Sequence, residues 1–215
     1  MLLVNCKNYE AASGRGLARM LSAARAAAKR HGTVVAIAPP HHMLAAAAGR
    51  GVPVFAQHVD TEGPGGTTGR VVPELLAGIG VAGSIINHSE RRVGMRHAAE
   101  AISRLEKLGM TSVACAGGPA EAGRMAALGP DYVAVEPPSL IGTGRSVSVH
   151  RPGVITAAAR AVSGGRSRLL CGAGITSGAD AQKASELGAS GVLVASGVVK
   201  APDWGRAISD LARFC

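Results

Sequence analysis

The sequence is poor in aromatic residues, and this shortage limits both its core and its partners. Only 2% of the 215 residues are aromatic, although 47% are hydrophobic. The core must therefore be filled by closely packed Ala, Val, Ile and Leu side chains. Interleaved aromatic and basic residues, which bind single-stranded nucleic acids by stacking on the bases, are missing as well.

Cysteine and long apolar runs are also scarce. The four cysteines, Cys6, Cys115, Cys171 and Cys215, show no metal-type pairing, and the first three lie in or beside apolar runs. Such cysteines are typical of buried free thiols in a reducing compartment. No apolar stretch approaches the length of a membrane span, and no charged leader precedes the first apolar run. We therefore expect a cytoplasmic protein without a membrane partner.

The formal net charge is +9, yet no run of five basic residues occurs. Lys and Arg are scattered through segments with helical periodicity, which is typical of a solvated basic surface. A nucleic-acid partner is not favoured, because neither a basic-aromatic stripe nor finger spacing accompanies the charge. A small substrate that carries phosphate suits the same positive field.

Short apolar runs alternate with Ala-, Leu- and Arg-rich segments of helical periodicity along the whole chain. The expected strands are Leu2–Asn5, Thr33–Ala38, Val52–Ala56, Gly83–Asn87, Thr111–Cys115, Tyr132–Val135, Arg168–Cys171 and Gly191–Ala195. The expected helices are Gly16–Arg30, His42–Gly49, Pro73–Gly78, Ala98–Leu108, Ala120–Leu128, Val154–Val162, Ala179–Leu187 and Trp204–Phe214.

The alternation predicts an α/β protein with a single (β/α)8 barrel over residues 1–215. Strands that are continuously apolar are buried on both faces, which favours a parallel sheet covered by helices. Eight such units indicate closure into a barrel. An open, doubly wound sheet is the alternative, but Asn5-Cys6-Lys7-Asn8-Tyr9 stands where that fold has its glycine-rich turn.

Barrels of this kind place their chemistry where strands end and loops begin. Asn5 and Lys7 end the first expected strand, and a lysine there suits a phosphate or a developing enolate oxygen. Polar pairs at strand ends are also common without a function. Glu136 ends the sixth expected strand, in position for a general base. A structural acid in a salt bridge is the alternative.

A dense polar cluster, Asn87-His88-Ser89-Glu90-Arg91-Arg92, follows the apolar pair Ile85-Ile86. At the start of a short helix, backbone dipoles favour a neutral imidazole at His88 that can polarise a carbonyl. The alternative is an ordinary helix N-terminus in which Ser89 is the cap and Glu90 binds backbone amides.

Three loops complete the candidate site. Small residues after the seventh and eighth strands, Gly172-Ala173-Gly174 and Ala195-Ser196-Gly197, let backbone N–H groups approach an anion, as barrel phosphate sites commonly do. Prolines at one hinge and glycines at the other are typical of a lid, although a buried Ω-loop is the alternative. The expected lid residues are Pro137, Pro138, Ser139, Leu140, Ile141, Gly142, Thr143 and Gly144.

In this order, the motifs resemble the triosephosphate isomerase family, in the short form of its archaeal branch. The resemblance spans nearly the whole chain, and the His-Ser-Glu-Arg-Arg run with the Glu-Pro strand end and Gly-Thr-Gly is highly specific. It is carried by Asn5-x-Lys7, Ala56-Gln57-His58-Val59-Asp60, Asn87-His88-Ser89-Glu90-Arg91-Arg92, Val135-Glu136-Pro137-Pro138, Ile141-Gly142-Thr143-Gly144, Cys171-Gly172-Ala173-Gly174-Ile175 and Val194-Ala195-Ser196-Gly197.

The resemblance implies a TIM barrel that interconverts dihydroxyacetone phosphate and D-glyceraldehyde 3-phosphate, in glycolysis and gluconeogenesis, without metal or organic cofactor. It also implies a homo-oligomer, more often a tetramer than a dimer. The family's division of labour makes Glu136 the base and His88 the neutral electrophile, with Asn5 and Lys7 on substrate oxygens and Glu90 beside them. Backbone groups around Ile141, Gly142, Gly174, Ala195 and Ser196 would bind the phosphate.

Two other functions stay open on the sequence alone. Another phosphate-binding barrel, such as an aldolase or an epimerase, would need a Schiff-base lysine or a second acid, and the sixth strand ends in a single glutamate. A non-catalytic nucleic-acid binder would use the basic surface.

Overall fold

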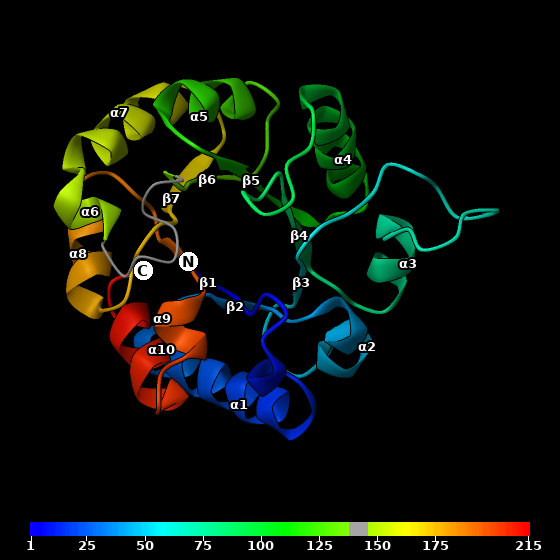
Figure 1. Ribbon diagram of the computed structural model, residues 1–215, viewed down its shortest axis with the longest axis horizontal. Helices are drawn as coiled ribbons and strands as arrows, with labels where there is room; N and C mark the ends of the chain where they lie inside the picture. Colours follow the sequence, from blue (N-terminus) through cyan, green and yellow to red (C-terminus); the bar gives the residue numbers. More distant parts are fainter. Residues whose placement is uncertain (138–145) are drawn as a thin grey trace.

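A computed structural model describes residues 1–137 and 146–215 and has eight parallel strands arranged as a barrel inside a ring of helices (Figure 1). The strands are β1 (Leu2–Asn5), β2 (Val35–Ala38), β3 (Phe55–Ala56), β4 (Gly83–Ile86), β5 (Thr111–Ala116), β6 (Tyr132–Val135), β7 (Arg168–Cys171) and β8 (Val192–Val194). The helices are η1 (Glu10–Ala12), α1 (Gly14–His31), η2 (His41–Met43), α2 (Leu44–Ala47), α3 (Pro73–Gly78), α4 (Met95–Lys107), α5 (Pro119–Ala126), α6 (Val147–His150), α7 (Pro152–Val162), α8 (Gly178–Glu186), α9 (Ser196–Val199) and α10 (Trp204–Ala212). The expected (β/α)8 barrel is confirmed.

Strand pairing runs in the order β2-β1-β8-β7-β6-β5-β4-β3, so the first and last strands of the chain are neighbours. Leu2 pairs with Val35 on one side and with Val192 on the other. The barrel closes between β2 and β3, where Ile37 forms a single bridge with Val54. Because every strand runs the same way, all strand ends that carry the polar residues open at one mouth.

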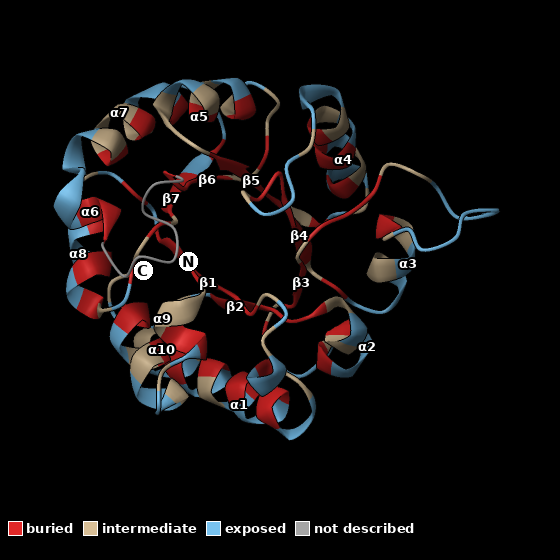
Figure 2. Cartoon of the chain, viewed as in Figure 1, coloured by how far each residue is buried: buried red, intermediate tan, exposed pale blue. Residues whose placement is uncertain are grey.

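Two apolar layers hold the barrel together. The inner layer fills the barrel with mostly small or branched side chains and the buried ring of Phe55, and Tyr132 packs against it from a partly buried position. Gly83 leaves room for that ring, since a Cβ at this position would lie 2.7 Å from the Phe55 side chain. The outer layer lies between the strands and the inward faces of the helices, which Figure 2 shows as buried. Closely packed small side chains therefore fill the core, which contains few aromatic rings.

The buried thiols expected from the sequence are present. Cys6, Cys115 and Cys171 are buried and free, and burial raises the pKa of Cys6 and of Cys171 to about 12. None of the described helices is long and apolar enough to cross a membrane.

Several elements differ from the sequence-based expectation. The third strand is only Phe55–Ala56 rather than Val52–Ala56, because it lies at the seam where pairing is a single bridge. The short helices α6 and α9 were not expected, since four residues are too few to show helical periodicity.

Candidate active site

A cavity of about 100 Å³ opens at the barrel mouth, at the carboxyl ends of the strands. Most of the candidate residues line it. They are Asn5 at the end of β1, Lys7 after β1, His88 after β4, Glu136 after β6, Gly174 after β7, and Ala195 and Ser196 after β8. Glu90 lies next to this cavity, in an adjoining hollow that Lys7 and His88 also line.

Glu136 is a buried carboxylate with an unsatisfied oxygen. It follows β6 directly and is only 5% exposed. Its Oε1 lies 3.5 Å from His88 Nε2, and its Oε2 has no hydrogen-bond partner among the described residues. A buried polar atom without a partner is costly, so such an atom at a cavity wall is typical of a group that acts on a ligand.

The neighbours of Glu136 determine where its side chain can lie. A Cβ on Gly172 would stand 2.5 Å from Glu136 Cγ, so only glycine leaves the carboxylate in this position. On the other side lies the Cys115 thiol, whose pKa is raised well above its ordinary value by burial and by the Glu136 charge. The thiol is therefore a neutral neighbour that does not add a second charge.

The Nε2 atom of His88 carries the ring proton, because the other ring nitrogen accepts a hydrogen bond. The Glu90 backbone N–H donates to His88 Nδ1 over 3.2 Å. A nitrogen that accepts a backbone N–H carries no proton, so the ring is neutral and the proton is on Nε2. That N–H is on the side of the ring that faces Glu136.

Asn87 and Glu121 hold the loop that carries His88. Asn87 has a backbone φ of +60°, a strained value that its side chain supports by bonds to the Cys115 carbonyl and the Val93 N–H. Glu121 accepts from Asn87 Nδ2, from the Gly117 N–H and from Arg92. Burial alone would raise the pKa of Glu121, but the Arg92 and Gly117 hydrogen bonds lower it.

Lys7 is held at the mouth by its own turn and by Glu90. Its backbone φ is +45°, and its N–H donates to Asn5 Oδ1 over 2.9 Å. The Gln57 side chain donates to the Lys7 carbonyl. Lys7 Nζ lies 2.6 Å from Glu90 Oε1, so the cation stands on the His88 side of the cavity.

The loops after β7 and β8 pack backbone against backbone. Gly174 has a φ of +68°, which lets the chain turn sharply beside the cavity. A Cβ on Gly197 would lie 2.5 Å from the Ile175 carbonyl oxygen, so the absence of a side chain at Gly197 lets the two loops approach this closely. Asp180 accepts hydrogen bonds from the backbone and hydroxyl groups of Thr176 and Ser177 and forms a capping box at the start of α8.

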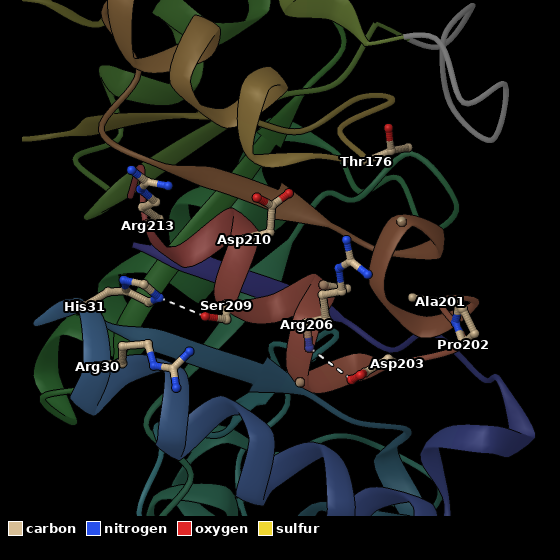
Figure 3. Close-up of a pocket in the computed structure, with 13 residues that line it drawn as sticks. Arg30, His31, Thr176, Ala201, Pro202, Asp203, Arg206, Ser209, Asp210 and Arg213 are labelled. Atoms are coloured by element: carbon tan, nitrogen blue, oxygen red, sulfur yellow. Dashed lines mark hydrogen bonds between the residues drawn. The ribbon is translucent and has the colours of Figure 1, made fainter.

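A larger hollow of about 920 Å³ lies outside the barrel, along α10 and the end of α1 (Figure 3). Arg30, Arg206 and Arg213 line it together with Asp203 and Asp210. Asp203 caps α10 by accepting from the Arg206 N–H, and His31 bonds to Ser209 across the hollow. Asn5, Lys7, His88, Glu90 and Glu136 do not line this hollow, although Thr176 and Gly197 from the loops after β7 and β8 do. Asp210, like Asp203, holds a helix start, because it accepts a hydrogen bond from the Gly178 N–H.

The structure thus gathers Asn5, Lys7, His88, Glu90 and Glu136 at one mouth, with the two small-residue loops after β7 and β8 lying between the ends of β6 and β1. Of the expected lid, Pro137 is buried next to Glu136, and the rest, Pro138 to Gly144 with the phosphate contacts Ile141 and Gly142, lies outside the described residues. Three other polar lining residues were missed: Tyr9, Thr176 and Lys200. Lys200 stands four residues after Ser196, a spacing that one helical turn would have revealed.

The comparisons with known proteins agree with this architecture. A model of the triosephosphate isomerase family matches residues 1–212. Triosephosphate isomerase of Cenarchaeum symbiosum is 52% identical over 214 residues, covering 99% of this chain and 96% of that protein. The Archaeoglobus fulgidus enzyme is 42% identical, with 98% and 96% coverage, and that of Caldivirga maquilingensis is 39% identical, with 99% and 96%. On this match over nearly its whole length, the chain belongs to the triosephosphate isomerase family.

Proposed function

We propose that Glu136 is the general base of a triosephosphate isomerase, which interconverts dihydroxyacetone phosphate and D-glyceraldehyde 3-phosphate through an enediolate. The observation that carries this assignment is the buried Glu136 carboxylate, whose Oε2 has no partner among the described residues while Oε1 lies 3.5 Å from His88. The isomerase activity follows from the family, and the residue roles are our proposal.

In the forward direction, Glu136 removes a proton from the hydroxylated carbon next to the carbonyl of dihydroxyacetone phosphate. The electron pair of the broken C–H bond moves into the enediolate, and negative charge develops on the carbonyl oxygen. The neutral His88 Nε2–H and the Lys7 ammonium stabilise that charge. His88 gives its Nε2 proton to this oxygen and takes the hydroxyl proton from the oxygen of the neighbouring carbon, which becomes the new carbonyl. Glu136 then returns its proton to the former carbonyl carbon, which gives the aldehyde product and restores both the base and the neutral imidazole.

The phosphate group is bound at the loops after β7 and β8. Gly174, Ala195 and Ser196 line the cavity there, and their small side chains leave backbone N–H groups accessible to an anion. We assign the backbone of Ile141 and Gly142 to the same role, as the lid arrives over the phosphate. Asn5 contacts substrate oxygens, and Glu90 orients Lys7.

The base assignment is tested by two substitutions at one position. Glu136→Gln removes the base, and Glu136→Asp withdraws it by one methylene. We expect each to lower kcat by about a hundredfold or more, because both proton transfer and reach are lost. A coupled assay of glyceraldehyde 3-phosphate conversion, run with a chelator, measures activity and cofactor need together. A Glu136→Gln enzyme with more than half of the parent turnover would reassign the base.

The lid assignment covers Pro137, Pro138, Ser139, Leu140, Ile141, Gly142, Thr143 and Gly144. An enediolate phosphate exposed to water eliminates its phosphate group, so the segment must close over the intermediate. Deletion of residues 140–143 should slow isomerisation sharply while methylglyoxal and free phosphate become a growing share of product. Both products are quantified from dihydroxyacetone phosphate in a variant with parental circular dichroism. An unchanged ratio of isomerisation to elimination would contradict the assignment.

We further propose that the protein acts in the cytoplasm as a homo-oligomer, as a tetramer rather than a dimer. Exposed apolar side chains on α3 support self-association, since Leu75 is 61% exposed. Triose phosphates are the proposed small-molecule partners, and no nucleic acid, metal or organic cofactor takes part.

A further inference from the structure

Lys200 lines the same cavity as the catalytic candidates, although no motif pointed to it. It follows α9 directly and lines the cavity together with Gly174, Ala195 and Ser196. It therefore belongs to the segment after β8, the strand that lies between β1 and β7.

Both the backbone and the side chain of Lys200 are held in place. Its N–H donates to the Ser196 carbonyl, and the Trp204 indole donates to the Val199 carbonyl just before it. Lys200 Nζ lies 5.5 Å from the centre of the Tyr9 ring, a cation–π distance. Tyr9 is fixed in turn, because its N–H donates to the Cys6 carbonyl and its own carbonyl accepts from Ala12.

The charges of the cavity leave Lys200 available for an anion. The other lysine there, Lys7, is bound to Glu90 at 2.6 Å. Lys200 has no carboxylate within 4.0 Å among the described residues. A phosphate dianion that enters the cavity also meets the Glu136 carboxylate, and this repulsion needs a compensating positive charge on the phosphate side.

We propose that Lys200 is a substrate-binding residue that supplies the positive charge for the phosphate dianion, with Tyr9 as the residue that positions it. The proposal rests on the proposed function, because it assigns the phosphate end of the same cavity. Lys200 in this role favours the binding of phosphate monoesters of three-carbon compounds over the same compounds without phosphate.

Binding of anions is measured first, because it does not require turnover. Inorganic phosphate and glycerol 3-phosphate are titrated calorimetrically into the parent, Lys200→Met and Arg206→Met. Arg206→Met is the matched control, since it removes one charge from the outer hollow of Figure 3. Loss of a charge-assisted contact should raise Kd about tenfold or more in Lys200→Met, with less than a twofold change in Arg206→Met.

Conservative variants separate charge from packing. Lys200→Arg keeps the cation and should recover most of the affinity. Tyr9→Phe keeps the aromatic face and should bind like the parent, whereas Tyr9→Leu should weaken binding severalfold with an unchanged melting temperature. Parental affinity in Lys200→Met, or an equal loss in Arg206→Met, would overturn the proposal.

Kinetics then test selectivity. Lys200→Met should lower kcat/KM for glyceraldehyde 3-phosphate mainly through KM, and by a much smaller factor for glyceraldehyde. Equal losses on both substrates would also overturn the proposal. If the parent binds phosphate through Lys200 but does not isomerise triose phosphates, the proposed function fails while the anion site stands.

Discussion

At the scale of single residues, the proposed catalytic groups are placed by backbone conformations and close contacts that few residues tolerate. Lys7 and Asn87 are the two non-glycine residues with positive φ in the described chain, and both stand at the cavity or directly before His88. Their strain is supported by side-chain hydrogen bonds to neighbouring backbone. Strain concentrated at these two positions is typical of a functional site.

Gly172→Ala should reduce activity far more than stability. The added methyl would lie 2.5 Å from Glu136 Cγ and must push the carboxylate aside. A displacement near 1 Å costs about a hundredfold in rate, whereas overpacking costs about 1–3 kcal/mol of unfolding free energy. Turnover and urea unfolding are measured together on this variant.

Gly153→Ala is the control for this substitution, since a Cβ there meets nothing within 4 Å. It should keep parental turnover. Parental turnover in Gly172→Ala as well would show that Glu136 is free to move without loss.

At the scale of elements, the loop after β7 depends on the capping of α8. Asp180 Oδ2 accepts four hydrogen bonds, two each from Thr176 and Ser177. Burial alone would raise the pKa of Asp180, but these bonds hold it below the ordinary value of 3.8. The loop that turns at Gly174 is therefore tied to a carboxylate in its charged form.

Asp180→Asn should lower the unfolding free energy by about 1–2 kcal/mol at neutral pH, because charged hydrogen bonds at a cap are lost. The folded pKa is depressed, so this contribution is fully present above pH 3.8. It is lost as the pH falls through the lower folded value. Urea midpoints of parent and variant should therefore converge in acid.

The measurement is a comparison of unfolding midpoints at pH 7, at pH 5 and at a third pH well below 3.8. Asp203→Asn, at the start of α10, is the matched control away from the cavity. A difference between parent and Asp180→Asn that is the same at all three pH values would contradict the ionic role.

At the scale of the molecule, a protruding loop and an uncovered helix face share one side of the barrel. The loop between β3 and α3 projects from the ring of helices, and its residues 63–70 are exposed (Figures 1 and 2). Leu75 and Ile79 on and beside α3 are 61% and 44% exposed. Burial of such apolar side chains against another copy is favourable.

We expect light scattering to give a mass of about four times the 21.5 kDa of one chain. Leu75→Glu should lower that mass at micromolar concentration, because a charge would be placed in a contact between copies. Val149→Glu, on the exposed face of α6, should leave it unchanged. A parent protein that is monomeric at high concentration would refute the expected assembly.

The sequence by itself determined the order of strands and helices, the barrel, and the strand-end residues Asn5, Lys7, His88 and Glu136. These features are local, because an apolar run and the polar residue that ends it are recognised within a few consecutive residues of the sequence. Only the tertiary structure decided that Nδ1 of His88 is an acceptor, that Gly172 makes room for Glu136, and that Lys200 stands over Tyr9. The Gly172 and Lys200 contacts join segments far apart in the chain, and barrel closure sets their distances. The His88 hydrogen bond is local, but it forms in the turn after Asn87, whose positive φ the sequence does not reveal.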